Sequence, residues 1–129
     1  MEIQELMPML CVRDLAASED FYRRVGFAVE FSEPHIALLR NGVAGLYLVT
    51  ESSPTMDKPG VSLIPLADPS RVAAVIVLRV ADCRQTHEEL VSGGVRFLTP
   101  PHEPPWGGWR CFAADPDGWL LEFEEAPQP

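Results

Sequence analysis

The sequence has few of the features that mark membrane, secreted or disulfide-rich proteins. No hydrophobic run approaches the ~18 residues that a membrane-spanning helix needs. The first residues are acidic rather than basic, so we expect no secretory signal. Cys11, Cys83 and Cys111 include no Cys-x-x-Cys pair, which predicts neither a disulfide framework nor a structural zinc site and favours a reducing cytoplasm. We interpret them as small buried apolar side chains, with a catalytic thiol as the alternative.

Basic residues are also scarce. Ten Lys and Arg against nineteen Asp and Glu give a formal charge of -9. This excess argues against nucleic acid and anionic membranes as partners and is compatible with a cationic ligand or metal ion. The sequence contains no Gly-x-Gly-x-x-Gly, Walker-type loop, nucleophile elbow or His-Glu-x-x-His motif. His35, His87 and His102 are scattered, and we interpret them as surface or second-layer residues.

What the sequence does contain is an internal repeat. A chain of 129 residues is long enough for one domain with a real core and short for two, so we expect a single domain over residues 1–129. At a constant offset of 68 positions, apolar, helix-capping and glycine positions of the first half recur in the second half. The aligned pairs include Leu10 with Leu78, Val12 with Val80, Asp14 with Asp82, and Gly26 with Gly94.

Each half predicts the order strand, helix, then three strands. The first module, about 6–50, is expected to hold strands at 7–13, 27–31, 35–40 and 44–50 and a helix at 15–25. A Pro-rich connector at about 51–71, with one short strand at 61–64, leads to the second module at about 72–125. There we expect strands at 73–80, 95–98, 109–113 and after residue 118, and a helix between Asp82 and Gly93. The predicted fold is α+β: a cupped, mixed eight-stranded sheet with the helices outside and a cleft inside.

A tight turn at Asp115-Pro116-Asp117-Gly118 precedes the last strand. In that strand, Leu121 and Phe123 share one face and Glu122 lies on the other. Glu122 is therefore an exposed carboxylate, the floor of a cavity, or the partner of an arginine. The arginines within reach of such a pairing are Arg13, Arg79 and Arg110.

Two segments, 12–27 and 115–123, resemble the vicinal-oxygen-chelate superfamily of glyoxalases, bleomycin-resistance proteins and extradiol dioxygenases. The resemblance covers about residues 6–125 and implies two tandem βαβββ modules. It also implies that metal-using members place ligands at the positions of Met7, Val75, Glu122 and Tyr47, or Leu46 in the alternative register. Strand parity favours Tyr47. Only Glu122 is a good ligand for a divalent ion, so the chain departs from the metalloenzyme pattern.

The resemblance therefore points to the metal-free, bleomycin-resistance-like branch, whose members are acidic dimers that hold a cationic drug in grooves at the subunit interface. We expect a homodimer that needs no cofactor and sequesters a cationic or aromatic antibiotic. Flat, adaptable side chains and one ionic anchor suit such a ligand. The predicted ligand-binding residues are Met7, Met9, Tyr47, Val75, Val77, Trp106, Trp109 and Glu122.

Three alternatives remain open at this point. One is a divergent metal-dependent lyase, transferase or dioxygenase that uses Glu122. A second is a shifted metal site formed by His102, Glu103 and Glu122. The third is a metal-free enzyme with Glu122 or Tyr47 as the catalytic acid or base, which would require burial to raise the pKa of Glu122.

Overall fold

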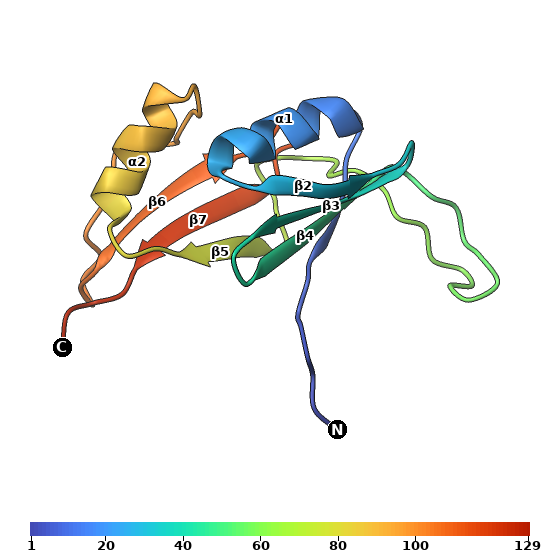
Figure 1. Ribbon diagram of the computed structural model, residues 1–129, viewed down its shortest axis with the longest axis horizontal. Helices are drawn as coiled ribbons and strands as arrows, with labels where there is room; N and C mark the ends of the chain where they lie inside the picture. Colours follow the sequence, from blue (N-terminus) through green and yellow to red (C-terminus); the bar gives the residue numbers. More distant parts are fainter.

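The computed structural model describes residues 1–129 and contains two helices and seven strands (Figure 1). The first module consists of β1 (Met9–Cys11), α1 (Leu15–Val25), β2 (Ala28–Ser32), β3 (Ile36–Asn41) and β4 (Ala44–Val49). The second module consists of β5 (Val75–Arg79), α2 (Cys83–Ser92), β6 (Trp109–Ala114) and β7 (Leu120–Glu125). The order of elements follows the predicted repeat, and the α+β class is confirmed.

The strands form two mixed sheets rather than one. The first sheet has the order β1-β4-β3-β2 and the second has the order β5-β7-β6. In each, the strand before the helix lies parallel to the last strand of its module, and the remaining pairs are antiparallel. The two sheets thus repeat the same connectivity, as the sequence repeat predicts.

The expected eighth strand, 95–98, is wrong as a continuous strand. Phe97 makes one isolated bridge to Ala113, and the Leu98 amide donates to the Phe112 carbonyl at 2.9 Å. The chain then reaches Pro100 and Pro101, which have no amide hydrogen and cannot extend a ladder. The expected strand at 61–64 is likewise reduced to an isolated bridge at Leu63.

Both helices begin and end where local signals place them. The Asp14 side chain accepts a hydrogen bond from the Ala17 amide at 3.1 Å, and Gly26 ends α1 with φ of 113°. These are the usual conformations of an N-cap and a left-handed C-cap. Asp82 caps α2 in the same way through the Gln85 amide. Neither helix is long and apolar enough to cross a membrane.

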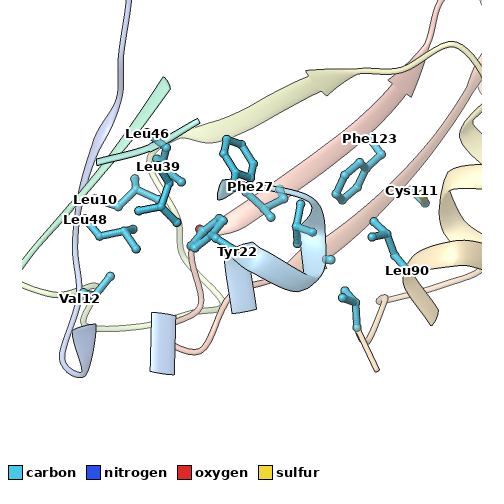
Figure 2. Packing of buried hydrophobic residues seen from close by; sticks show 14 of the residues in the cluster. Leu10, Val12, Tyr22, Phe27, Leu39, Leu46, Leu48, Leu90, Cys111 and Phe123 are labelled. Carbon is cyan, nitrogen blue, oxygen red and sulfur yellow. The ribbon is translucent and has the colours of Figure 1, made fainter. Parts of the chain in front are cut away.

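The helices cover the same side of the two sheets and share one core (Figures 1 and 2). Tyr22 of α1 stacks edge-on against Phe27, with ring centroids 5.9 Å apart. Leu121 and Phe123 of β7 belong to the same buried cluster, as their predicted face requires. The core therefore runs without a break from one module into the other.

A buried hydrogen-bond network links the modules at the Asp115–Gly118 turn. The Tyr22 hydroxyl donates to Asp115 Oδ2 at 2.8 Å, and Asp115 Oδ1 accepts from the amides of Asp117 and Trp119, each at 2.9 Å. The Trp119 indole in turn donates to the carbonyl of Cys11 at 2.9 Å. Elements β1 and α1 of the first module are thereby joined to a turn of the second module around one carboxylate.

Asp117 extends this network to Arg13. Its Oδ1 accepts from the Arg13 amide at 3.0 Å and from Nη1 at 2.8 Å. Gly118 has φ of 95°, and a Cβ there would lie 2.5 Å from the Pro69 side chain, so the turn requires glycine. The connector thus packs directly onto the turn.

Burial raises the pKa of the Asp115 carboxyl, and the hydrogen bonds from Tyr22, Trp119 and Asp117 oppose this shift. A carboxyl whose pKa is higher in the folded state binds more protons there. Its contribution to stability is therefore greatest at low pH and declines as the pH rises from the ordinary Asp range, about 4, through the raised value.

Tyr22→Phe should lower the free energy of unfolding by about 1 to 3 kcal/mol, because it leaves Asp115 Oδ2 buried without its donor. Tyr47→Phe is the matched control, since the Tyr47 hydroxyl makes no hydrogen bond within the chain. Urea denaturation followed by circular dichroism measures both. Equal stabilities of the two variants would contradict the bridging role of Tyr22.

Candidate functional site

The two sheets each turn one face away from the helices, here called the open face. Met9 and Tyr47 are direct neighbours on the open face of the first sheet, and Val77 and Glu122 are direct neighbours on that of the second. Leu46 lies on the opposite, core side of β4 and is 2% exposed. The parity argument that selected Tyr47 over Leu46 therefore agrees with the geometry.

An apolar cavity of about 370 Å³ lies between the residues before β1, strand β4 and the edge strand β5. Met7, Val75 and Val77 line it, together with Leu6 and Gly45. Eleven of its thirteen lining residues are hydrophobic. A cavity of this composition offers mainly apolar contact area; the hydroxyl of Tyr22, which also lines it, donates to Asp115.

A second, polar pocket of about 240 Å³ lies around the start of β6 and the end of β7. Trp106, Trp109 and Glu122 line it, with Arg110 and Glu124. It shares no lining residue with the apolar cavity. The predicted single pocket is thus divided within one chain. Met9 lies in a third, shallow groove, and Tyr47 lines none of these three pockets.

The two predicted tryptophans have different surroundings. Trp106 lies in the loop before β6 and is 67% exposed. Trp109 lies directly opposite Glu125, on the helix side of β6, and its ring packs against the core. The Arg84 guanidinium of α2 covers that ring, 4.3 Å from its centroid. Trp106 is the more exposed of the two rings, and the Arg110 guanidinium lies over it, 5.2 Å from its centroid.

The donor set does not fit a divalent metal ion. Of the four positions that resemble metal-ligand sites, Met7 and Val75 line the apolar cavity, whereas Glu122 lines the polar pocket. No three His, Cys, Asp or Glu side chains are grouped so as to hold an ion, so His102 and Glu103 do not gather around Glu122. Three ligands of this kind are the usual minimum.

The thiols are also unsuited to catalysis. All three cysteines are free and buried. Burial raises the pKa of Cys111 to about 12, and the nearby Cys83 thiol, with its Sγ 3.5 Å away, adds to the shift. A neutral buried thiol is a poor nucleophile. The prediction that the three cysteines are buried is confirmed.

The sequence analysis considered Arg110 only as a possible ion-pair partner of Glu122, a pair that the structure does not form, and it missed Phe112. Arg110 and Phe112 alternate along β6 on the same face as Glu122, and the Arg110 guanidinium lies 5.2 Å from the Trp106 ring centroid and 5.4 Å from that of Phe112. The period-two pattern of β6 was a usable signal for their shared face. The stacking was not predictable, because Trp106 is positioned by a loop.

Trp109→Ala should lower the free energy of unfolding by about 2 to 3 kcal/mol, since it removes a ring packed on the core. Trp106→Ala should change it by less than about 0.5 kcal/mol, because that side chain is mostly exposed. Urea titrations of the two variants, followed by far-ultraviolet circular dichroism, make the comparison. A comparable loss from both would contradict the different placement of the two rings.

Comparisons with known proteins agree with this architecture. Residues 3–123 match the model of the Glyoxalase/Bleomycin resistance protein/Dioxygenase superfamily. A search of curated proteins finds no match. The fold is similar to that of a bleomycin-binding protein crystallised with bleomycin, at a TM-score of 0.71, 24% identity and coverage of 96% of this chain and 99% of that one.

Two further structures share the fold. A bleomycin resistance determinant encoded on the transposon Tn5 is 24% identical, with a TM-score of 0.73 and coverage of 98% and 100% of the two chains. Lactoylglutathione lyase from Agrobacterium tumefaciens is 19% identical, with a TM-score of 0.76 and coverage of 98% and 96%. At these identities the likeness shows the fold alone. On the family match over 3–123, this chain belongs to the glyoxalase/bleomycin resistance protein/dioxygenase superfamily.

Proposed function

We propose that this protein binds a cationic or aromatic small molecule without a metal ion and leaves it chemically unchanged, as in antibiotic sequestration. The observation that carries the proposal is the set of side chains at the four metal-ligand-like positions. Met7, Val75 and Tyr47 replace the imidazole and carboxylate donors that a catalytic ion needs, and Glu122 stands alone. Without an ion, the same positions supply contact area for a ligand.

The exposed side chains support binding over chemistry. Trp106 offers a flat ring for stacking, and Glu122 offers a carboxylate with no hydrogen bond or ion pair of its own. Arg79 and Arg13, which were candidate partners of Glu122, instead pair with Glu124 and Asp117, each at 2.8 Å. The Glu122 carboxylate therefore remains available to bind a cationic group of a ligand.

The proposal includes a second copy of the chain. Met9, Val75 and Val77 expose 46%, 39% and 50% of their surface, and all three lie on the open faces of the sheets. Exposed apolar side chains of this kind favour association. The apolar cavity and the polar pocket are separate in one chain, and pairing of open faces between copies would bring such half-sites together. The likeness to a bleomycin-binding protein supports a small-molecule ligand.

Bleomycin is the first probe to test, because two proteins of the same fold are named for it. We expect saturable quenching of tryptophan fluorescence, the same affinity with and without a chelator, and recovery of unmodified drug by mass spectrometry. Trp106→Ala should abolish most of the quenching, and Glu122→Gln should weaken binding about tenfold through the lost charge-assisted contact.

Elemental analysis of protein purified without a nickel column or chelator provides the control. A full equivalent of zinc, nickel, manganese or iron, or activity that a chelator removes, would contradict metal-independent binding and favour the lyase, transferase or dioxygenase alternative.

Val77→Asp should convert a dimer into a monomer, because it places a charge in the middle of the open apolar face. Val91→Asp is the matched control, since Val91 is 48% exposed on α2, on the helix side. Sedimentation velocity measures both variants against the unmodified chain. A monomeric unmodified protein would overturn the dimer, and a dimer retained in Val77→Asp would place the interface elsewhere.

A further inference from the structure

The open face of the second sheet carries equal numbers of opposite charges, in contrast to the acidic chain as a whole. Arg79 and Arg110 lie there with Glu122 and Glu124, two positive charges against two negative ones. Glu125 lies on the other face, where its Oε1 accepts a hydrogen bond from the Cys83 amide at 2.9 Å. The polar pocket itself is lined by Arg110 together with Glu122, Glu124 and Glu125, so a ligand there meets both signs of charge.

Pairing within the chain uses half of these charges. Arg79 Nη2 lies 2.8 Å from Glu124 Oε1. Glu124 is the residue directly opposite Arg110 across the β6–β7 ladder, so its pairing with Arg79 leaves Arg110 without its nearest carboxylate. Glu122 is the diagonal neighbour of Arg110, at a spacing of about 7 to 8 Å in an antiparallel pair. Neither Arg110 nor Glu122 makes a side-chain hydrogen bond or ion pair.

Aromatic stacking explains why Arg110 does not turn toward Glu122. Its guanidinium carbon lies 5.2 Å from the Trp106 ring centroid and 5.4 Å from that of Phe112. A guanidinium held over aromatic faces is less hydrated and less mobile than a free one, yet its N–H edge remains available. Arg110 is thus a positioned donor for a planar oxyanion, and carboxylates bind such a fork through two parallel hydrogen bonds.

We propose that the polar pocket selects a compact aromatic zwitterion, with Arg110 binding the ligand's carboxylate, Glu122 its cationic group and Trp106 contacting its ring. The inference rests on the proposed binding function and narrows its ligand class, because a ligand that is only cationic leaves Arg110 unused. Arg110 is the specificity-determining residue in this arrangement. Trp106, Arg110 and Glu122 all line the same pocket of about 240 Å³, which accommodates a small ligand or one end of a larger one.

Three probes, each with one phenyl ring, distinguish the contribution of the ligand's positive charge from that of its negative charge. L-Phenylalanine carries both charges, phenethylamine only the cation, and 3-phenylpropionate only the anion. Isothermal titration of the full-length protein should give the tightest binding for phenylalanine, by about tenfold over each single-charge probe. Arg110→Gln should remove the preference for phenylalanine over phenethylamine while phenethylamine still binds. Glu122→Gln should remove the preference over 3-phenylpropionate.

Arg71→Gln and Glu88→Gln are the matched controls, because both side chains are exposed and make no ion pair. Each control variant should keep the tenfold preference for phenylalanine over the single-charge probes. That result would show that the preference depends on the charges in the pocket and not on the total charge of the chain. Arg110→Lys keeps the charge but loses the bidentate fork, and it should show an intermediate preference. Circular dichroism of each variant confirms that the compared proteins are folded.

The outcomes separate this inference from the proposed function. If phenethylamine binds the unmodified protein as tightly as phenylalanine, or if Arg110→Gln leaves the preference intact, zwitterion selection is wrong and cation binding stands. If none of the three probes binds while bleomycin does, the inference is again overturned and the function stands. If bleomycin also fails to bind, both are overturned.

Discussion

The two modules depend on one buried carboxylate for their relative position. Asp115 is 5% exposed and accepts three hydrogen bonds, from the Tyr22 hydroxyl and from two amides of its own turn. A buried acceptor without partners is costly, so any arrangement that separates Tyr22 from the turn is disfavoured. The hydrogen bond from Trp119 to Cys11 and the contact of Asp117 with Arg13 follow from the same placement. An internal repeat is thereby joined asymmetrically, through residues whose counterparts in the other module differ in type.

The same constraint positions the candidate site. With the turn joined to α1 and β1, strand β7 must run from the module junction toward the far end of the second sheet, and it carries Glu122 and Glu124 along the open face. Both helices then occupy the opposite side of the sheets (Figure 1). Stability and site geometry are separated in space: the carboxylate that joins the modules is buried, and the one offered to a ligand is not.

One scaffold can carry different site chemistries, because the fold depends on buried residues and the site on exposed ones. Val75 and Tyr47 lie on strands, where such side chains suit a half-buried surface, and Met7 lies just before β1. None of the three is an imidazole or a carboxylate. On the open face of the second sheet, Arg110 and Glu122 make no ion pair within the chain.

Helices α1 and α2, the order of the strands, and the faces of Tyr47, Leu121 and Glu122 were determined by the sequence itself. They depend on local signals, namely caps, glycines and alternation, together with an internal repeat that exposes the register. The segment 95–98 was mispredicted because a continuous ladder needs successive amide donors along the strand. The chain soon reaches Pro100 and Pro101, which have no amide hydrogen. Only the tertiary structure decided that Trp109 faces α2, that Arg79 forms an ion pair with Glu124, and that Arg110 stacks on Trp106. These depend on the reach of side chains between strands and loops, which spacing along the chain does not encode.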